Sequence, residues 1–131
     1  MQTRPTILIV DRNRNVREYL KRELELEGYH IRLAENCREI FAMIDDNKKF
    51  DLVIIDPDLP DTEETSLFRK LQSLRPRTPV VIHTLIAEYL DHCSVLIEAV
   101  FIEKDGNSIE RIKQVVEHQL SQIKQQRAHS F

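Results

Sequence analysis

Carboxylate, hydroxyl and amine side chains follow four short apolar segments of this 131-residue chain. Clustered carboxylates repel one another unless a cation neutralises them, and hard divalent ions, chiefly Mg²⁺, prefer oxygen ligands of this kind. A carboxylate can also act as a nucleophile toward a phosphoryl group, while a metal ion and an ammonium offset the charge on the transferred oxygens. These residue types indicate phosphoryl-transfer or magnesium chemistry, and the candidates are Asp11, Asp56, Asp58, Thr84 and Lys104.

For these side chains to meet, the apolar segments before them must be neighbouring strands. Most of the segments are unbroken runs rich in β-branched residues, as in strands buried on both faces of a parallel sheet. The predicted strands are residues 7–10, 29–33, 52–55, 80–82 and 100–102, of which 29–33 alternates between apolar and polar residues like an edge strand. Apolar residues at helical spacing predict helices near residues 16–26, 40–44, 67–74, 87–98 and 109–123.

The alternation of strands and helices predicts the fold class, an α/β protein with a doubly wound, five-stranded parallel sheet in a flavodoxin-like (βα)5 sandwich. We adopt the strand order 2-1-3-4-5 because it is usual for sheets of this size. Sites in such sheets form beyond the carboxyl ends of the strands, where the candidate residues stand. We expect one domain over residues 1–124 and a polar C-terminal tail over residues 125–131.

Composition excludes several classes of protein. Hydrophobic residues make up 41% and charged residues 31% of the chain, which is a globular rather than a disordered balance. No apolar run is long enough to span a bilayer, and we recognise no secretion signal, so a cytoplasmic location is expected. The net charge of -3 argues against direct binding of nucleic acid. Cys37 and Cys93 lack metal-ligand spacing and are expected to be reduced thiols.

Five blocks of the sequence, in order, resemble the receiver domain of two-component response regulators. They cover about residues 5–120 and read ILIVDRN, EGYHIRLAEN, FDLVIIDPDLPD, PVVIHT and FIEK. The third block is the most specific, since a strand that ends in Asp followed by xxLPD is characteristic of these domains. The resemblance implies a phosphorylation-gated signalling protein whose partner is a histidine kinase or a phosphotransfer protein in a phosphorelay.

The resemblance also implies roles for individual residues. Asp56 matches the phosphoacceptor, and Thr84 matches the switch hydroxyl that turns toward the phosphoryl group. Lys104 matches the amine that pairs with that group, and Phe101 matches the switch aromatic. Beyond autophosphorylation and at most autophosphatase activity, no enzymatic function is implied.

The metal site implied by the resemblance is altered in this chain. Asp11, Asp56 and Asp58 match positions that hold Mg²⁺, but Arg12 stands where the family has a second acidic residue. Replacing an anion with a cation weakens the attraction for a divalent ion, so weak Mg²⁺ binding is expected. The Asp58 side chain, usually uncharged in this family, could supply the missing carboxylate.

Two further departures concern the surroundings of Thr84 and Lys104. Leu85 replaces the small residue that usually follows the switch hydroxyl. Asp105 replaces the proline that commonly follows the lysine with a cis peptide bond. A cis bond before a non-proline residue costs about 2.5–4 kcal/mol, so we expect a trans bond after Lys104.

Two other functions compete with the phosphorylated receiver. One is a pseudo-receiver, a phosphorylation-independent protein-interaction module, favoured by a guanidinium at Arg12 that could neutralise the pocket beside Asp56 without metal. The other is a phosphatase of the haloacid-dehalogenase type, suggested by the DxD of Asp56 and Asp58. That class places DxD on the first strand and needs further acidic residues after the lysine, so it is disfavoured.

The last predicted helix suggests self-association. Its apolar stripe continues past the point where a receiver's final helix usually ends. We therefore expect Leu120 and Ile123 to be exposed or to pack against a partner. The family's usual contact surface, formed by helix four, strand five and helix five, is the expected face of a homodimer.

Overall fold

The computed structural model describes residues 4–62, 67–73, 78–85 and 99–128, with the backbone alone described from residue 123 onward. Its strands form one sheet in the order β2-β1-β3-β4-β5, and the four pairs of neighbouring strands are parallel. The predicted fold class and strand order are therefore confirmed. The strands are β1 (Thr6–Val10), β2 (His30–Ala34), β3 (Leu52–Ile55), β4 (Val80–Thr84) and β5 (Val100–Glu103).

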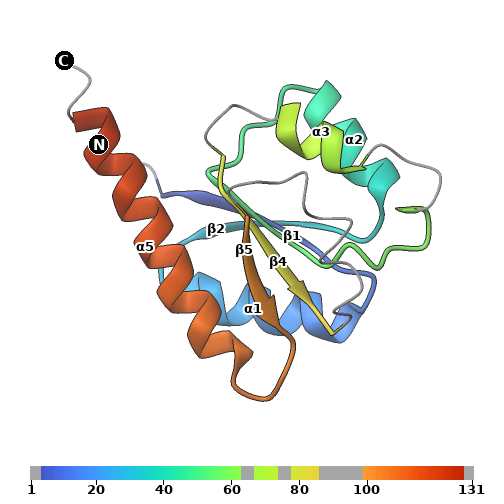
Figure 1. Cartoon of the computed structure of the whole chain (residues 1–131), viewed down its shortest axis with the longest axis horizontal. Helices are drawn as coiled ribbons and strands as arrows, with labels where there is room; N and C mark the ends of the chain where they lie inside the picture. Colours follow the sequence, from blue (N-terminus) through green and yellow to red (C-terminus); the bar gives the residue numbers. More distant parts are fainter. Residues whose placement is uncertain (1–3, 63–66, 74–77, 86–98, 129–131) are drawn as a thin grey trace.

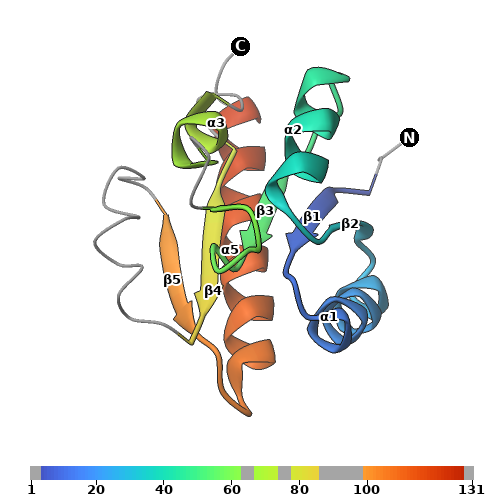
Figure 2. The same cartoon turned by 90° about the vertical axis from the view of Figure 1, so that its right-hand side faces the viewer.

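The described helices cover both faces of this sheet. They are α1 (Arg14–Leu26), α2 (Cys37–Asp45), α3 (Leu67–Ser73) and α5 (Ser108–Ala128). Helices α1 and α5 lie on one face, whereas α2 and α3 lie on the other (Figures 1 and 2). The helix predicted at residues 87–98 lies outside the described residues. None of the described helices is long and apolar enough to cross a membrane.

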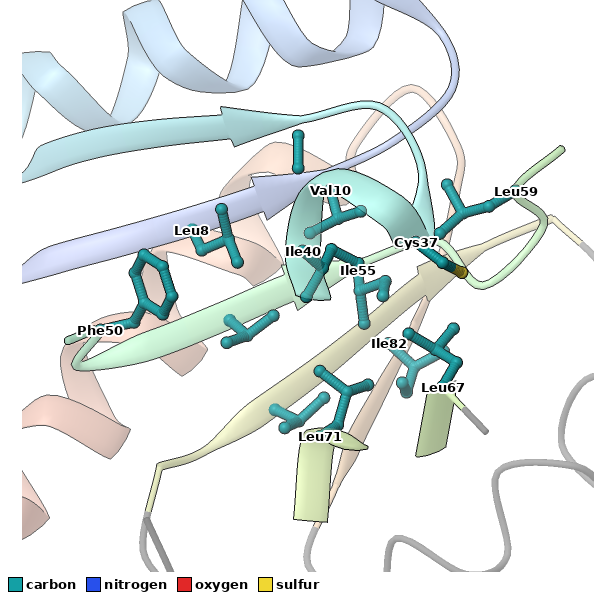
Figure 3. Packing of buried hydrophobic residues seen from close by; sticks show 13 residues of the cluster. Leu8, Val10, Cys37, Ile40, Phe50, Ile55, Leu59, Leu67, Leu71 and Ile82 are labelled. Atoms are coloured by element: carbon teal, nitrogen blue, oxygen red, sulfur yellow. The ribbon is translucent and has the colours of Figure 1, made fainter. Parts of the chain in front are cut away.

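Alternate residues of the central strands serve two separate hydrophobic cores. In β1, Leu8 and Val10 belong to the cluster under α2 and α3, whereas Ile7 and Ile9 belong to the cluster under α1 and α5. Figure 3 shows the first cluster, where strand residues meet side chains of α2 and α3. Because both faces are covered, the central strands appear in the sequence as unbroken apolar runs.

Side-chain caps and residues with positive φ delimit the first two helices. The Asn13 Oδ1 atom accepts hydrogen bonds from the backbone of Asn15 at 2.8 Å and Val16 at 3.2 Å, which begins α1. Helix α1 ends before Gly28, whose φ of 96° suits glycine. At α2, Asn36 is the N-cap and Asn47 takes a φ of 57° after the helix. The chain therefore turns back toward the next strand shortly after each helix.

The C-terminal helix differs from the sequence-based expectation. Helix α5 continues through Ala128, beyond residue 124, where the tail was expected to begin. Leu120 is partly buried and packs against the core cluster under α1 and α5, so the expectation that the core leaves it uncovered is wrong. Residues of α1 belong to the same cluster, so α5 packs against a core that includes α1 as well as the sheet. The side chain of Ile123 lies outside the described residues.

Candidate functional site

The register of β1 and β3 places the first two candidate carboxylates side by side. Val10 of β1 pairs with Ile55 of β3, and the next residues along these parallel strands are Asp11 and Asp56. The backbone N–H of Asp56 donates to the carbonyl of Val10 at 2.9 Å. Both carboxylates are buried, with 2% of Asp11 and 6% of Asp56 exposed. Burial of two adjacent acids requires a neutralising cation.

The ammonium of Lys104 supplies that cation. Its Nζ atom lies 2.7 Å from Asp11 Oδ2 and 2.6 Å from Asp56 Oδ2. Lys104 follows β5, and its backbone N–H donates to the carbonyl of Thr84 at 3.0 Å. Burial lowers the pKa of the amine, but the hydrogen bonds and charges of the two carboxylates outweigh burial, so the pKa is raised above its ordinary value. The ammonium stays charged in this pocket.

The second oxygen of each carboxylate fixes the loop that follows its strand. Asp11 Oδ1 accepts from the backbone N–H of Asn13 at 2.8 Å. Asp56 Oδ1 accepts from the backbone N–H of Asp58 at 2.9 Å. Each buried acid therefore combines a charge-assisted hydrogen bond to lysine with one to a backbone amide, and both side chains are held in a defined orientation.

Arg12 and Asp58 form an ion pair at the rim of the pocket. Arg12 NH1 lies 3.8 Å from Asp58 Oδ1, and the two side chains are 51% and 36% exposed. Arg12 thus pairs with Asp58, whereas the sequence hypothesis placed its guanidinium beside Asp56. Within the described residues, no three acidic, His or Cys side chains form a set able to hold a metal ion.

A divalent cation would nevertheless find suitable donors at the centre of the pocket. Asp11 and Asp56 already converge on one cationic nitrogen, so both carboxylates can face a single cation. Carboxylate oxygens are the ligand type that Mg²⁺ prefers. The donor set fits the ion with two carboxylates, while the Asp58 carboxylate is engaged by Arg12.

Thr84 and Phe101 lie on β4 and β5, the two strands that follow β3 in the sheet. Thr84 is 8% exposed at the carboxyl end of β4 and is in register with Glu103, the residue before Lys104. Phe101 is 42% exposed on β5, and Leu85, after Thr84, is 70% exposed. Thr84 therefore reaches the same edge of the sheet as the carboxylates. The peptide bond after Lys104 is trans, as predicted.

The structure adds a residue to the site that sequence reasoning missed. The Asp61 carboxylate accepts from the backbone N–H groups of Cys37 at 2.8 Å and Arg38 at 3.1 Å. Burial raises the pKa of Asp61, but these hydrogen bonds lower it more. Asp61 thereby joins the loop after Asp56 to the first turn of α2. Nothing in local sequence spacing reveals this contact, because 24 positions separate Asp61 from Cys37.

The role of His83 was also missed, because this residue stands just after the predicted strand at residues 80–82 and is not among the candidate residues. It is 4% exposed in β4, and its Nε2 atom lies 3.0 Å from Ser108 Oγ at the start of α5. Burial, followed by the charge of Lys104, lowers the pKa of His83 to about 4. The ring is therefore neutral at physiological pH. Its position next to Thr84 connects the site to α5.

Comparison with known proteins gives the family. The family model described as the response regulator receiver domain matches residues 7–117. The chain belongs to this family, whose general role is phosphorylation-gated signalling in two-component systems and which generally binds Mg²⁺.

Curated relatives match a part of their own length. Response regulator MprA of Mycolicibacterium vanbaalenii is 35% identical over 78 residues, which cover 60% of this chain and 33% of that protein. The phosphate regulon transcriptional regulatory protein PhoB of Pseudomonas aeruginosa is 38% identical over 85 residues, covering 63% of this chain and 37% of PhoB. The matched segment therefore spans about a third of these relatives.

Solved structures match almost end to end. A CheY-like receiver domain protein from Methanospirillum hungatei has a TM-score of 0.79 and 31% identity, covering 94% of this chain and 99% of that chain. The response regulator TrrA from Thermotoga maritima, solved in complex with Mg²⁺-BeF, has a TM-score of 0.76 and 28% identity, covering 88% and 98%.

Proposed function

We propose that Asp56 accepts a phosphoryl group from a histidine kinase or a phosphotransfer protein, and that the modified state changes the affinity of this domain for its partners. The observation that supports this most is the shared ammonium, since Lys104 Nζ contacts both Asp11 and Asp56 within 2.7 Å. A buried carboxylate beside a fixed cation is suited to attack an anionic phosphoryl group.

The transfer follows from these contacts. An Asp56 carboxylate oxygen attacks phosphorus, and a new oxygen–phosphorus bond forms. The phosphorus–nitrogen bond of the donor's phosphohistidine breaks, and its electron pair returns to the imidazole nitrogen. Lys104 offsets the negative charge of the transferred oxygens, and the Thr84 hydroxyl is the switch group that binds one of them. Phe101, half-exposed on β5, is the aromatic residue that responds to Thr84.

The same residues would hold Mg²⁺. We assign Asp11 and Asp56 as carboxylate ligands and Asp58 as the source of a backbone carbonyl, in line with the family. When bound, the ion supplies positive charge that stabilises the transferring phosphoryl oxygens. Arg12 weakens this site, because its guanidinium repels a divalent cation and holds the Asp58 carboxylate at the rim.

Mass spectrometry tests the assignment of Asp56. After treatment with acetyl phosphate and Mg²⁺, we expect one phosphoryl adduct in the parent and none in Asp56→Asn. The carboxamide keeps the shape of the side chain but is a poor nucleophile. An adduct that survives this substitution would place the acceptor elsewhere.

A pseudo-receiver is the alternative function, and one observation favours it. Lys104 pairs with both the Asp11 and Asp56 carboxylates and offsets part of their charge without a metal ion, so the pocket does not need a metal to hold these acids together. Titration with Mg²⁺ and beryllofluoride, followed by amide chemical shifts, separates the two functions. A phosphorylatable receiver responds around Asp56, whereas a pseudo-receiver shows neither these shifts nor an adduct.

We further propose that the domain works in the cytoplasm and does not itself bind nucleic acid. Its net charge of -3 supports this proposal, because proteins that bind phosphate backbones generally carry an excess of positive charge. Relatives such as PhoB are named as transcriptional regulators and are longer than the segment matched here. An output function of that type would reside in other parts of a longer protein.

A further inference from the structure

A buried hydrogen-bond chain connects β4 to the turn after Lys104. His83 Nε2 lies 3.0 Å from Ser108 Oγ, and Ser108 Oγ donates to the carbonyl of Asp105 at 3.0 Å. Only 4% of His83 and 7% of Ser108 are exposed, so water competes little for these bonds. The chain therefore extends from the residue before Thr84 to the residue after Lys104.

The direction of these bonds fixes the tautomer of His83. A hydroxyl has one proton, and that of Ser108 is donated to the Asp105 carbonyl. Ser108 Oγ must therefore accept from His83, which places the ring proton on Nε2. The Nδ1 atom then carries a lone pair, and it has no hydrogen-bond partner in the described part of the chain.

A polar ring at this buried position destabilises the fold relative to an apolar side chain. The residues before it in β4, Val80, Val81 and Ile82, are apolar and buried. An unsatisfied buried acceptor destabilises a fold, and an apolar residue of similar size would avoid that cost. The Nε2–H group and its bond to Ser108 are what His83 provides and an apolar residue lacks.

The turn at Asp105 determines where Lys104 enters the pocket. Lys104 is held on one side by its backbone bond to Thr84 and on the other by the turn at Asp105. That turn is also tied by Arg111, whose NH2 atom lies 2.8 Å from Asp105 Oδ2, but this pair is about 45% exposed and therefore screened by solvent. The Asp105 carbonyl also accepts from the Ser108 backbone N–H at 3.2 Å, and the Ser108 hydroxyl connects this partly buried attachment to His83.

We propose that His83 is a positioning residue which, through Ser108, fixes the turn after Lys104 and holds the Lys104 ammonium against Asp11 and Asp56. Its catalytic consequence rests on the proposed function of Asp56, whereas its effect on Lys104 does not. Through the same contacts, a movement of Lys104 toward a phosphoryl group would be transmitted to Ser108, the first residue of α5.

Nuclear magnetic resonance tests the positional part without any phosphorylation. In the parent, imidazole nitrogen shifts should report a protonated Nε2 and an unprotonated Nδ1 for His83. The Lys104 ammonium should give a resolved, slowly exchanging signal, because two carboxylates hold it. We expect that signal to broaden or vanish in His83→Leu and Ser108→Ala, and to persist in His83→Gln, whose amide nitrogen can reach the position of Nε2.

Kinetics test the consequence for the reaction. We expect His83→Leu and Ser108→Ala to slow modification of Asp56 by acetyl phosphate roughly tenfold, as when an outer hydrogen-bond partner of a site is removed, and His83→Gln to recover most of the rate. Val116→Ala is the matched control. It removes buried packing between α5 and the sheet far from Lys104, and should lower the melting temperature with little change in rate.

The outcomes separate the two proposals. Absence of an adduct in the parent, with the Lys104 signal still dependent on His83, contradicts the proposed function alone. A Lys104 signal and a modification rate that are the same in the parent and in His83→Leu overturn the positioning role alone. Equal slowing in Val116→Ala and His83→Leu also overturns it, because the effect would then follow stability rather than Lys104.

Discussion

At the scale of single residues, the pocket is governed by the sharing of one ammonium between two buried carboxylates. Lys104 Nζ lies within 2.7 Å of Asp11 and Asp56, so a divalent ion that binds the same oxygens must compete with it. The sequence predicted these three residues and their common edge of the sheet. It did not predict the partner of Arg12, because the orientation of a long surface side chain depends on which acids lie near it in space.

Arg12 gives the first prediction. Arg12→Asp should raise Mg²⁺ affinity about tenfold, because it removes a cation from the rim, adds an anion and releases Asp58. Calorimetric titration with Mg²⁺ measures the change. Arg14→Asp, an equal charge change at the exposed start of α1, is the control and should have a smaller effect. Equal affinities of Arg12→Asp and the parent would mean that Arg12 does not influence the ion.

His83 gives a prediction about pH. Burial, followed by the charge of Lys104, lowers its pKa from 6.5 to about 4, so the unfolded chain binds the proton first as pH falls. Above about pH 6.5 the ring is neutral in both the folded and the unfolded chain, and the free energy of unfolding is not reduced. As the pH falls toward 4, the free energy of unfolding decreases by roughly 2–3 kcal/mol. Urea unfolding at pH 7 and pH 4.5 should show this loss in the parent and a smaller one in His83→Leu. Parallel pH profiles for the two proteins would refute the assignment.

At the scale of elements, the sequence was most informative where burial produces a regular pattern of apolar residues. The apolar runs that became β1 and β3 are covered on both faces, and the helix predicted near residues 16–26 ends where α1 ends. The expected end of β4 was too early, because His83 and Thr84 are polar residues that nevertheless extend the strand while buried. Polar burial depends on partners such as Ser108, which no local pattern reveals.

Asp61 gives the prediction at this scale. Its carboxylate caps two amides in the first turn of α2, so Asp61→Ala should destabilise the domain by about 1–2 kcal/mol. Chemical denaturation measures this loss. Asp46→Ala, which removes an exposed carboxylate just after the other end of α2, should change stability much less. Equal losses in the two variants would show that the cap on Cys37 and Arg38 is not what stabilises the loop.

At the scale of the whole molecule, the packing of α5 beside α1 on one face of the sheet accounts for part of the apolar stripe on the C-terminal helix. Leu120 packs against the core shared by α1 and α5, and Lys113 lies 3.1 Å from Glu23 of α1. The apolar stripe on α5 is thus partly used within the chain, which the sequence could not indicate without knowing that α1 lies beside it. For the described part of α5, self-association is therefore expected to rest on another surface.

Among the described residues, the edge at β5 is one candidate for that surface. Phe101 on β5 is 42% exposed, and Leu85 after β4 is 70% exposed. In a symmetric dimer both copies use the same apolar patch, so Phe101 becomes buried on each of the two subunits. We expect light scattering at micromolar concentration to show a dimer that beryllofluoride strengthens and Phe101→Glu weakens. Leu26→Glu, at a 76% exposed leucine of α1, should leave the mass unchanged. A monomeric mass for the parent with and without beryllofluoride would remove dimerisation from the mechanism, and phosphorylation would then act on a different partner.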